Sequence, residues 1–87
     1  ELKDFKIYPN PALVGSEIAV ELLNKQAATL SIVNILGQVV IQFELAAHPQ
    51  STTYHIPISN QLKAGSYFMH LETKSDKVTR QIMFIEY

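Results

Sequence analysis

The fold is decided by the stretch TLSIVNILGQVVIQFEL, residues 29–45. In both halves apolar side chains alternate with polar ones, as in Leu30-Ser31-Ile32. Alternation with a period of two is typical of a strand that has one buried and one solvent-facing side. Gly37 separates the halves and can adopt a positive φ without steric cost. We therefore expect a β-hairpin with strands at residues 29–35 and 38–45.

The same alternation recurs along the rest of the chain. Further strands are expected at residues 5–8, 18–22, 53–58, 67–72 and 78–85. Prolines follow the first of these strands and interrupt the third, and a residue without a backbone N–H belongs at a sheet edge. Seven short strands with turn signals between them predict an all-β fold, a seven-stranded antiparallel immunoglobulin-like β-sandwich. The Cys–Trp–Cys core of true immunoglobulin domains is missing, so the prediction concerns architecture alone.

Length and composition narrow the class of protein. With 87 residues and 47% hydrophobic content, residues 1–87 are expected to form a single domain with its own core. A net charge of −1 gives no electrostatic attraction to nucleic acid or to an anionic membrane. Cysteine is absent, and no apolar run approaches the roughly 18 residues that span a bilayer. The first residue is not Met and no signal peptide precedes the first strand, so we expect a fragment of a longer protein, in which any export signal would lie upstream.

No constellation of residues suited to catalysis or metal binding is visible. His48 is expected in a loop, whereas His55 and His70 fall on polar phases of two strands, where they are either ladder neighbours or simply solvent-facing. A zinc site needs three or four converging ligands, so the solvent-facing alternative is favoured. The serines lack a nucleophile elbow, the carboxylates are scattered and three dispersed glycines cannot cradle a phosphate. We predict a protein that is not an enzyme and that needs no cofactor.

Three apolar residues occupy phases where polar ones are expected, namely Val33, Val40 and Phe68. Single exposed apolar residues are ordinary. If these three converge, they form a patch for another protein or for a second copy of this chain, which makes a homodimer one option. The last strand is apolar on both phases near its end, so it is either covered on both sides or open to edge pairing.

Four segments of the chain resemble, in order and spacing, the C-terminal sorting domains of the type IX secretion system of the Bacteroidota. The first is Tyr8-Pro9-Asn10-Pro11, near the start. The second is the strand–turn–strand around Gly37, and the third is Leu62-Lys63-Ala64-Gly65-Ser66-Tyr67-Phe68. The fourth is the basic-then-apolar Lys77-Val78-Thr79-Arg80-Gln81-Ile82-Met83. Each motif alone is weak, but four in sequence cover essentially the whole chain.

The resemblance implies a non-catalytic address. Such a domain directs an N-terminal cargo from the periplasm through the type IX outer-membrane translocon. A sortase-like protease then commonly removes it, at or before Glu1 here, and anchors the cargo at the cell surface. By the same resemblance the candidate recognition residues are Pro9, Asn10, Pro11, Gly37, Gly65, Tyr67, Lys77, Arg80, Ile82 and Phe84.

Structural roles compete with recognition for each of these residues. The prolines can serve only to stiffen a strand exit, Gly37 and Gly65 to supply φ freedom, and Tyr67 to fill the core. A different class of function is a surface adhesion or carbohydrate-binding β-sandwich that stays attached to its parent protein. That alternative predicts a concave aromatic or calcium-bearing site, for which the sequence offers no acidic cluster.

Overall fold

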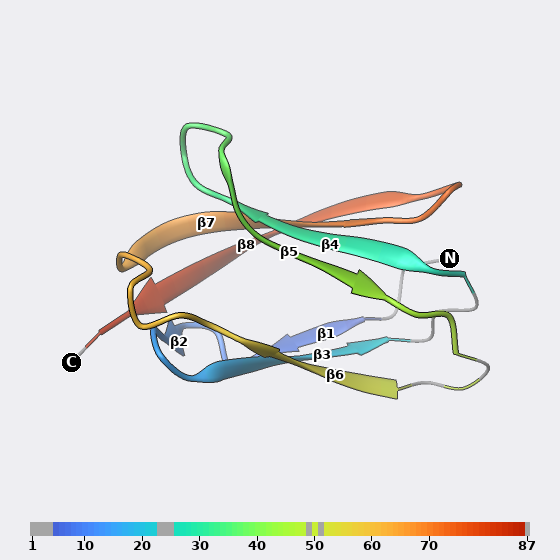
Figure 1. The fold of residues 1–87 in the computed structure, drawn as a ribbon, viewed down its shortest axis with the longest axis horizontal. Helices are drawn as coiled ribbons and strands as arrows, with labels where there is room; N and C mark the ends of the chain where they lie inside the picture. Colours follow the sequence, from blue (N-terminus) through green and yellow to red (C-terminus); the bar gives the residue numbers. More distant parts are fainter. Residues whose placement is uncertain (1–4, 23–25, 49, 51, 87) are drawn as a thin grey trace.

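The computed structural model describes residues 5–22, 26–48, 50 and 52–86. Strands and connecting loops make up this part of the chain, as the alternating pattern predicts (Figure 1). The strands are β1 (Lys6–Tyr8), β2 (Ala12–Leu13), β3 (Glu17–Leu22), β4 (Ala28–Val33), β5 (Val39–Leu45), β6 (Thr52–Pro57), β7 (Gly65–Glu72) and β8 (Lys77–Ile85).

The strands form two sheets that face each other as two layers (Figure 1). One sheet has the order β1-β3-β6, and the other has the order β2-β8-β7-β4-β5. All neighbours are antiparallel except β2 and β8, which run parallel. The all-β prediction is confirmed, and so is the edge position of the proline-bearing strand β6.

The predicted number of seven strands is wrong, because the described residues contain eight. The additional strand is β2, two residues long, in which Ala12 pairs with Phe84 and Leu13 with Ile85. Two residues cannot display an alternating pattern, and parallel pairing with the other end of the chain leaves no local turn signal. The predicted wholly antiparallel arrangement is also wrong, because β2 pairs with β8 in parallel.

The core lies between the two sheets and draws on both. Ile18, Val20 and Leu22 face it from β3, and Leu30 and Ile32 face it from β4, as the alternation predicts. β7 and β8 contribute residues from one phase each, which are Tyr67, Met69, Leu71, Ile82 and Phe84. Val33 is also buried, although its phase points outward, because Phe68 and Val39 lie opposite it on the flanking strands.

Tyr67 anchors one end of this core. Its ring meets the ring of Phe84 edge-on, with centroids 5.4 Å apart and planes inclined by 68°. Its hydroxyl donates a hydrogen bond of 2.6 Å to the carbonyl of Lys63. A buried aromatic side chain with a satisfied hydroxyl contributes both apolar area and orientation.

We expect Tyr67→Ala to lower the free energy of unfolding by about 3–5 kcal/mol, because it leaves a cavity beside Phe84. Tyr67→Phe should lower it by about 1 kcal/mol, since only the hydrogen bond to Lys63 is lost. Urea denaturation followed by far-UV circular dichroism measures both. Tyr8→Ala, at an exposed position, serves as the control. An unchanged midpoint for Tyr67→Ala would contradict the packing role.

Candidate recognition surface

The segment from Tyr8 to Pro11 carries the chain from one sheet to the other. β1 ends at Tyr8 in the three-stranded sheet, and β2 begins at Ala12 in the five-stranded sheet. The peptide bonds preceding Pro9 and Pro11 are both cis. The two prolines lack the N–H that would let either sheet continue through this crossing.

Asn10 lies between the two prolines, and its side chain completes the edge of β8. Its amide nitrogen donates to the carbonyl of Gln81 at 3.3 Å, and its side-chain oxygen accepts from the N–H of Met83 at 3.1 Å. One side chain therefore supplies a donor and an acceptor to alternate residues of a strand, as a neighbouring strand would. The same edge of β8 is covered further along by the parallel strand β2. A hydrogen bond from the N–H of Val14 to the carbonyl of Ile85 covers its end.

The third motif, which contains Gly65 and Tyr67, lies on the other side of β8. Gly65 is opposite Phe84 in the ladder between β7 and β8, and Tyr67 is opposite Ile82. Gly65 has a φ of +147°, which L side chains rarely adopt. Ile82 and Phe84 are fully buried, so within this fold they are available to a receptor only through their effect on the position of β8.

The hairpin between β4 and β5 is organised by Asn34. Its side-chain oxygen accepts from the backbone N–H of Leu36 at 2.9 Å and from that of Gln38 at 3.0 Å. The N–H of Gly37 donates to the carbonyl of Asn34, and Gly37 has a φ of +83°. A turn followed by a glycine with positive φ is a common three-residue hairpin connection. The predicted hairpin is therefore confirmed, with β4 ending at Val33 instead of at residue 35.

Ile35 and Leu36 occupy the tip of this turn and are 77% and 78% exposed. The tip rises from the five-stranded layer, away from the other sheet (Figure 1). Turn positions usually carry polar residues, so two aliphatic side chains held outward are unusual. Sequence reasoning placed Ile35 in a strand and missed this exposure. The spacing of Asn34 and Gly37 is the signal that could have revealed it.

The two basic candidates on β8 have different surroundings. Lys77 is exposed at the start of the strand, opposite Glu72 in the ladder. The guanidinium of Arg80 lies over the ring of Phe5, 4.6 Å from its centroid. Such a cation–π contact stabilises by about 0.5–1 kcal/mol at an exposed site. Arg80 therefore links β8 to the segment that leads into β1, whatever else it binds.

The outer face of the five-stranded sheet is divided into a polar and an apolar half. Toward the start of β4 it carries Thr29, Glu44, Glu72 and Lys77, with Ser31, Gln42, His70 and Thr79 in the next row. Toward the hairpin it carries Phe68, 38% exposed, then Met83 and Ile85, 42% and 41% exposed. Val33 lies opposite Phe68, and Val40 is exposed beside Val39. The three outward apolar residues predicted from the sequence therefore do converge at one end of this face.

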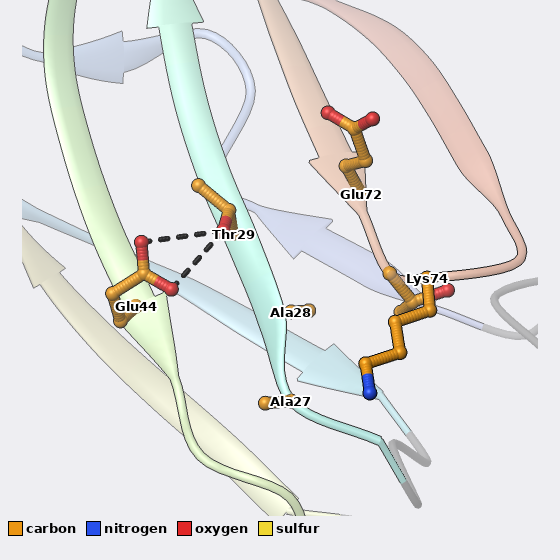
Figure 2. Close-up of a pocket in the computed structure, with 7 residues that line it drawn as sticks. Ala27, Ala28, Thr29, Glu44, Glu72 and Lys74 are labelled. Carbon is orange, nitrogen blue, oxygen red and sulfur yellow. Dashed lines mark hydrogen bonds between the residues drawn. The ribbon is translucent and has the colours of Figure 1, made fainter.

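A shallow pocket of about 350 Å³ lies at the polar end (Figure 2). It is lined by Ala27, Ala28, Thr29, Glu44, Glu72, Thr73 and Lys74. The hydroxyl of Thr29 lies 3.0 and 3.2 Å from the two carboxylate oxygens of Glu44, so that carboxylate is already engaged. Figure 2 shows the side chains of Glu72 and Lys74 turned in different directions.

The histidines lie in three separate places. His48 contacts Gln50, His55 pairs with Glu17 at 3.3 Å, and the ring of His70 lies 2.8 Å from the hydroxyl of Thr79. The option that His55 and His70 are ladder neighbours is wrong, because β6 and β7 belong to different sheets. Among the residues that the structure describes, no three His, Cys, Asp or Glu side chains are placed to hold a metal ion. The same residues include no helix long and apolar enough to cross a membrane.

Most of the sequence-derived candidates therefore gather around β8. Asn10 bonds to its backbone, Gly65 and Tyr67 lie opposite it, and Arg80, Ile82 and Phe84 belong to it. Gly37 lies apart in the hairpin, and Lys77 lies at the far end of β8. The arrangement defines a small all-β protein in which most candidate residues of the sequence motifs lie on or beside one strand. Such a concentration is expected of a domain that other proteins recognise.

The family comparison identifies that domain. The family model described as secretion system C-terminal sorting domain matches residues 6–86. The chain belongs to this family, and the resemblance found in its motifs is confirmed. It is a C-terminal sorting signal of the type IX secretion system, which directs its cargo protein through the outer-membrane translocon. No curated protein matches the chain significantly. Sorting domains of this family are typically non-catalytic.

We expect Asn10→Ala to lower the free energy of unfolding by about 1–3 kcal/mol, because it removes two hydrogen bonds to β8. Amide exchange at Met83 should accelerate more than exchange at Met69, which lies on the central strand β7. Hydrogen-exchange NMR resolves the two amides. Asn60→Ala, at another exposed asparagine, is the matched control. Equal effects of the two substitutions would contradict the bonding of Asn10 to β8.

Gly37 offers a test that separates conformation from contact. A Cβ added at Gly37 would meet no described atom within 4 Å, so a substitution acts through the positive φ alone. We expect Gly37→Ala to cost about 1–2 kcal/mol in stability, and Gly37→Asn to cost less because asparagine tolerates this region better. Thermal unfolding measures both. Equal losses for Ala and Asn would show that the backbone angle is not the constraint.

Proposed function

We propose that the type IX machinery recognises this domain as a folded β-sandwich and docks on the outer apolar end of the five-stranded sheet. The family match identifies the chain as a sorting signal, and the exposed Phe68, Met83 and Ile85 support this choice of surface. They lie on neighbouring strands, with Phe68 opposite Gln81 and Ser66 opposite Met83. A contiguous apolar patch on a small domain commonly marks a protein-binding site.

In this proposal the family motifs act mainly by placing β8. Pro9, Asn10 and Pro11 position the strand edge, and Gly65 and Tyr67 fix the neighbouring strand. Ile82 and Phe84 fasten one phase of β8 to the core, which leaves Met83 and Ile85 on the other phase, facing outward. Lys77, Arg80 and Gly37 are candidates for peripheral contacts. Recognition of a pre-organised surface has the advantage that little ordering entropy is lost on docking.

We infer that the arrangement is immunoglobulin-like, with residues 1–87 acting as one domain. A first strand that changes sheets, as β1 and β2 do, and two opposed sheets whose neighbours are antiparallel except for β2 and β8 support this classification. A self-contained core supports independence from the cargo, because such a module folds without help from its neighbour.

We further propose that the domain passes through the periplasm attached to its cargo and is then removed by a sortase-like protease, with the cargo anchored at the cell surface. The cut is assigned to the linker at or before Glu1, which lies outside the described residues. The structure supports a cut ahead of Phe5, because Phe5 is already buried and lies under Arg80. Proteases act on extended, accessible chain and not on such a packed segment.

A reporter fusion tests this function. Residues 1–87 are placed behind a fluorescent protein that carries a signal peptide, and the fusion is expressed in a type IX-competent bacterium and in a translocon-null strain. We expect reporter at the surface or in the medium of the competent strain alone. Retention in the periplasm of both strains, with the domain shown to be folded, would contradict the sorting function.

The docking surface is tested in the same assay with Met83→Ser and Ile85→Ser combined. Both side chains are exposed, so thermal stability should change little while surface display falls by about tenfold or more. Thr79→Ser, on the same phase of β8 but in the polar half of this face, is the control. Normal display of the Met83/Ile85 variant would reject this surface while leaving the sorting function intact. Deletion of β8 residues is unsuitable, because Phe84 belongs to the core.

A further inference from the structure

The four edge strands of the two described sheets are protected very unequally. The edges are β1 and β6 in one sheet, and β2 and β5 in the other. β1 and β2 have three and two residues and are bordered by prolines, and β6 ends in Pro57. Short length and proline are features that prevent sheets from pairing edge to edge. β5 has neither feature, because it extends over seven residues and contains no proline and no basic residue.

The free part of the β5 edge is the segment from Ile41 to Leu45. The register with β4 shifts between Ile32 and Val33, so Val40 is left without a partner as a bulge. A bulge twists the start of an edge strand and limits pairing there. Beyond the bulge the ladder is regular, with Ile41 opposite Ile32 and each following residue paired in turn.

The side chains of this segment are only partly covered. Ile41 and Phe43 pack against the core on one side and remain half-buried, because β5 is the last strand of its sheet. An added strand would cover both side chains and satisfy the open backbone groups at once. Glu44 carries the only charge in the sequence of β5.

We propose that a second copy of this chain pairs with β5 in antiparallel orientation, about a two-fold axis that lies at Ile41, Gln42 or Phe43. Such a dimer joins the two five-stranded sheets into one continuous sheet. The interface is isologous, so the same strand must complement itself. The alternating pattern of β5 meets this requirement, because Ile41 faces an apolar residue of the other copy for each of the three centres, namely Ile41, Phe43 or Leu45.

The position of the single charge is compatible with pairing between two copies. When the axis lies at Ile41 or at Gln42, Glu44 falls beyond the regular pairing, because its counterpart in the other copy would be Gln38 or Val40, before or at the bulge. With the axis at Phe43, Glu44 faces Gln42. In none of the three registers do the two Glu44 side chains face each other, which would be destabilising. The net charge of −1 adds little long-range repulsion between copies.

The size of the contact sets its strength. One pair of strand edges buries less than the roughly 1,200 Å² found in stable specific interfaces, so we expect a dissociation constant between about 1 μM and about 1 mM. The pairing also leaves the outer apolar end of each sheet open, because it extends the sheet and does not cover its face. Self-association and docking on Phe68, Met83 and Ile85 are therefore compatible.

Sedimentation equilibrium of the 87-residue chain, from about 1 μM to about 1 mM, tests the proposal. We expect a reversible monomer–dimer equilibrium within this range. Gln42→Glu should weaken it by about threefold or more, because it brings further negative charge to the two-fold axis. Gln81→Glu, an exposed glutamine of the same sheet face on β8, is the matched control and should leave it unchanged.

Cysteine crosslinking locates the axis, because the natural chain contains no cysteine. Single cysteines are placed at Ile41, Gln42 and Phe43, with Gln81→Cys as the control. The position that forms a disulfide with itself under mild oxidation marks the centre of the dimer. A monomer up to about 1 mM would overturn the proposal. So would a dimer that responds equally to Gln42→Glu and Gln81→Glu, since its contact would then lie elsewhere.

Discussion

The two hydrogen bonds between the side chain of Asn10 and the backbone of β8 connect positions 71 and 73 residues apart in the chain. They continue the edge that β2 begins, so the last strand of the domain is bordered on both sides by residues from elsewhere in the sequence. Loop closure over such a distance costs conformational entropy, which the pairing must offset. The crossing at Pro9 and Pro11 restricts the backbone on both sides of Asn10 and so lowers that cost.

The core transmits this constraint to the surface. Ile82 and Phe84 are buried on one phase of β8, and the ring of Tyr67 meets that of Phe84 edge-on. Because side chains alternate along a strand, fixing one phase in the core fixes the other phase outside it. A one-residue slip of β8 would exchange the two sets, burying Met83 and exposing Phe84. The hydrogen bond from the N–H of Met83 to Asn10 opposes that slip. The motif residues therefore hold the exposed patch in position.

Alternation in the sequence was sufficient to predict the main strands and their faces. Leu30 and Ile32, and likewise Tyr67, Met69 and Leu71, are buried as the pattern indicates. It could not predict β2, because two residues hold no period and their partner lies at the other end of the chain. The bonding of Asn10 to β8 could not be predicted either, because its partners lie at the other end of the chain. An asparagine between prolines indicates a turn, but it does not indicate which strand the turn borders. The family motifs identified the function, whereas the exposure of Ile35 and Leu36 depended on the turn geometry that Asn34 imposes.

The proposed docking gives this sorting signal the task of reporting that its own fold is complete, because the docking surface forms only when the sheet forms. The exposed residues of β8 suit this task. Met83 and Ile85 take their positions only when β7 has paired on one side and Asn10 and β2 have paired on the other. Residues near both ends of the domain are therefore required to present a few side chains on one strand. A receptor that binds those side chains distinguishes the folded domain from an unfolded chain of the same sequence, without contacting the motifs that make the distinction possible.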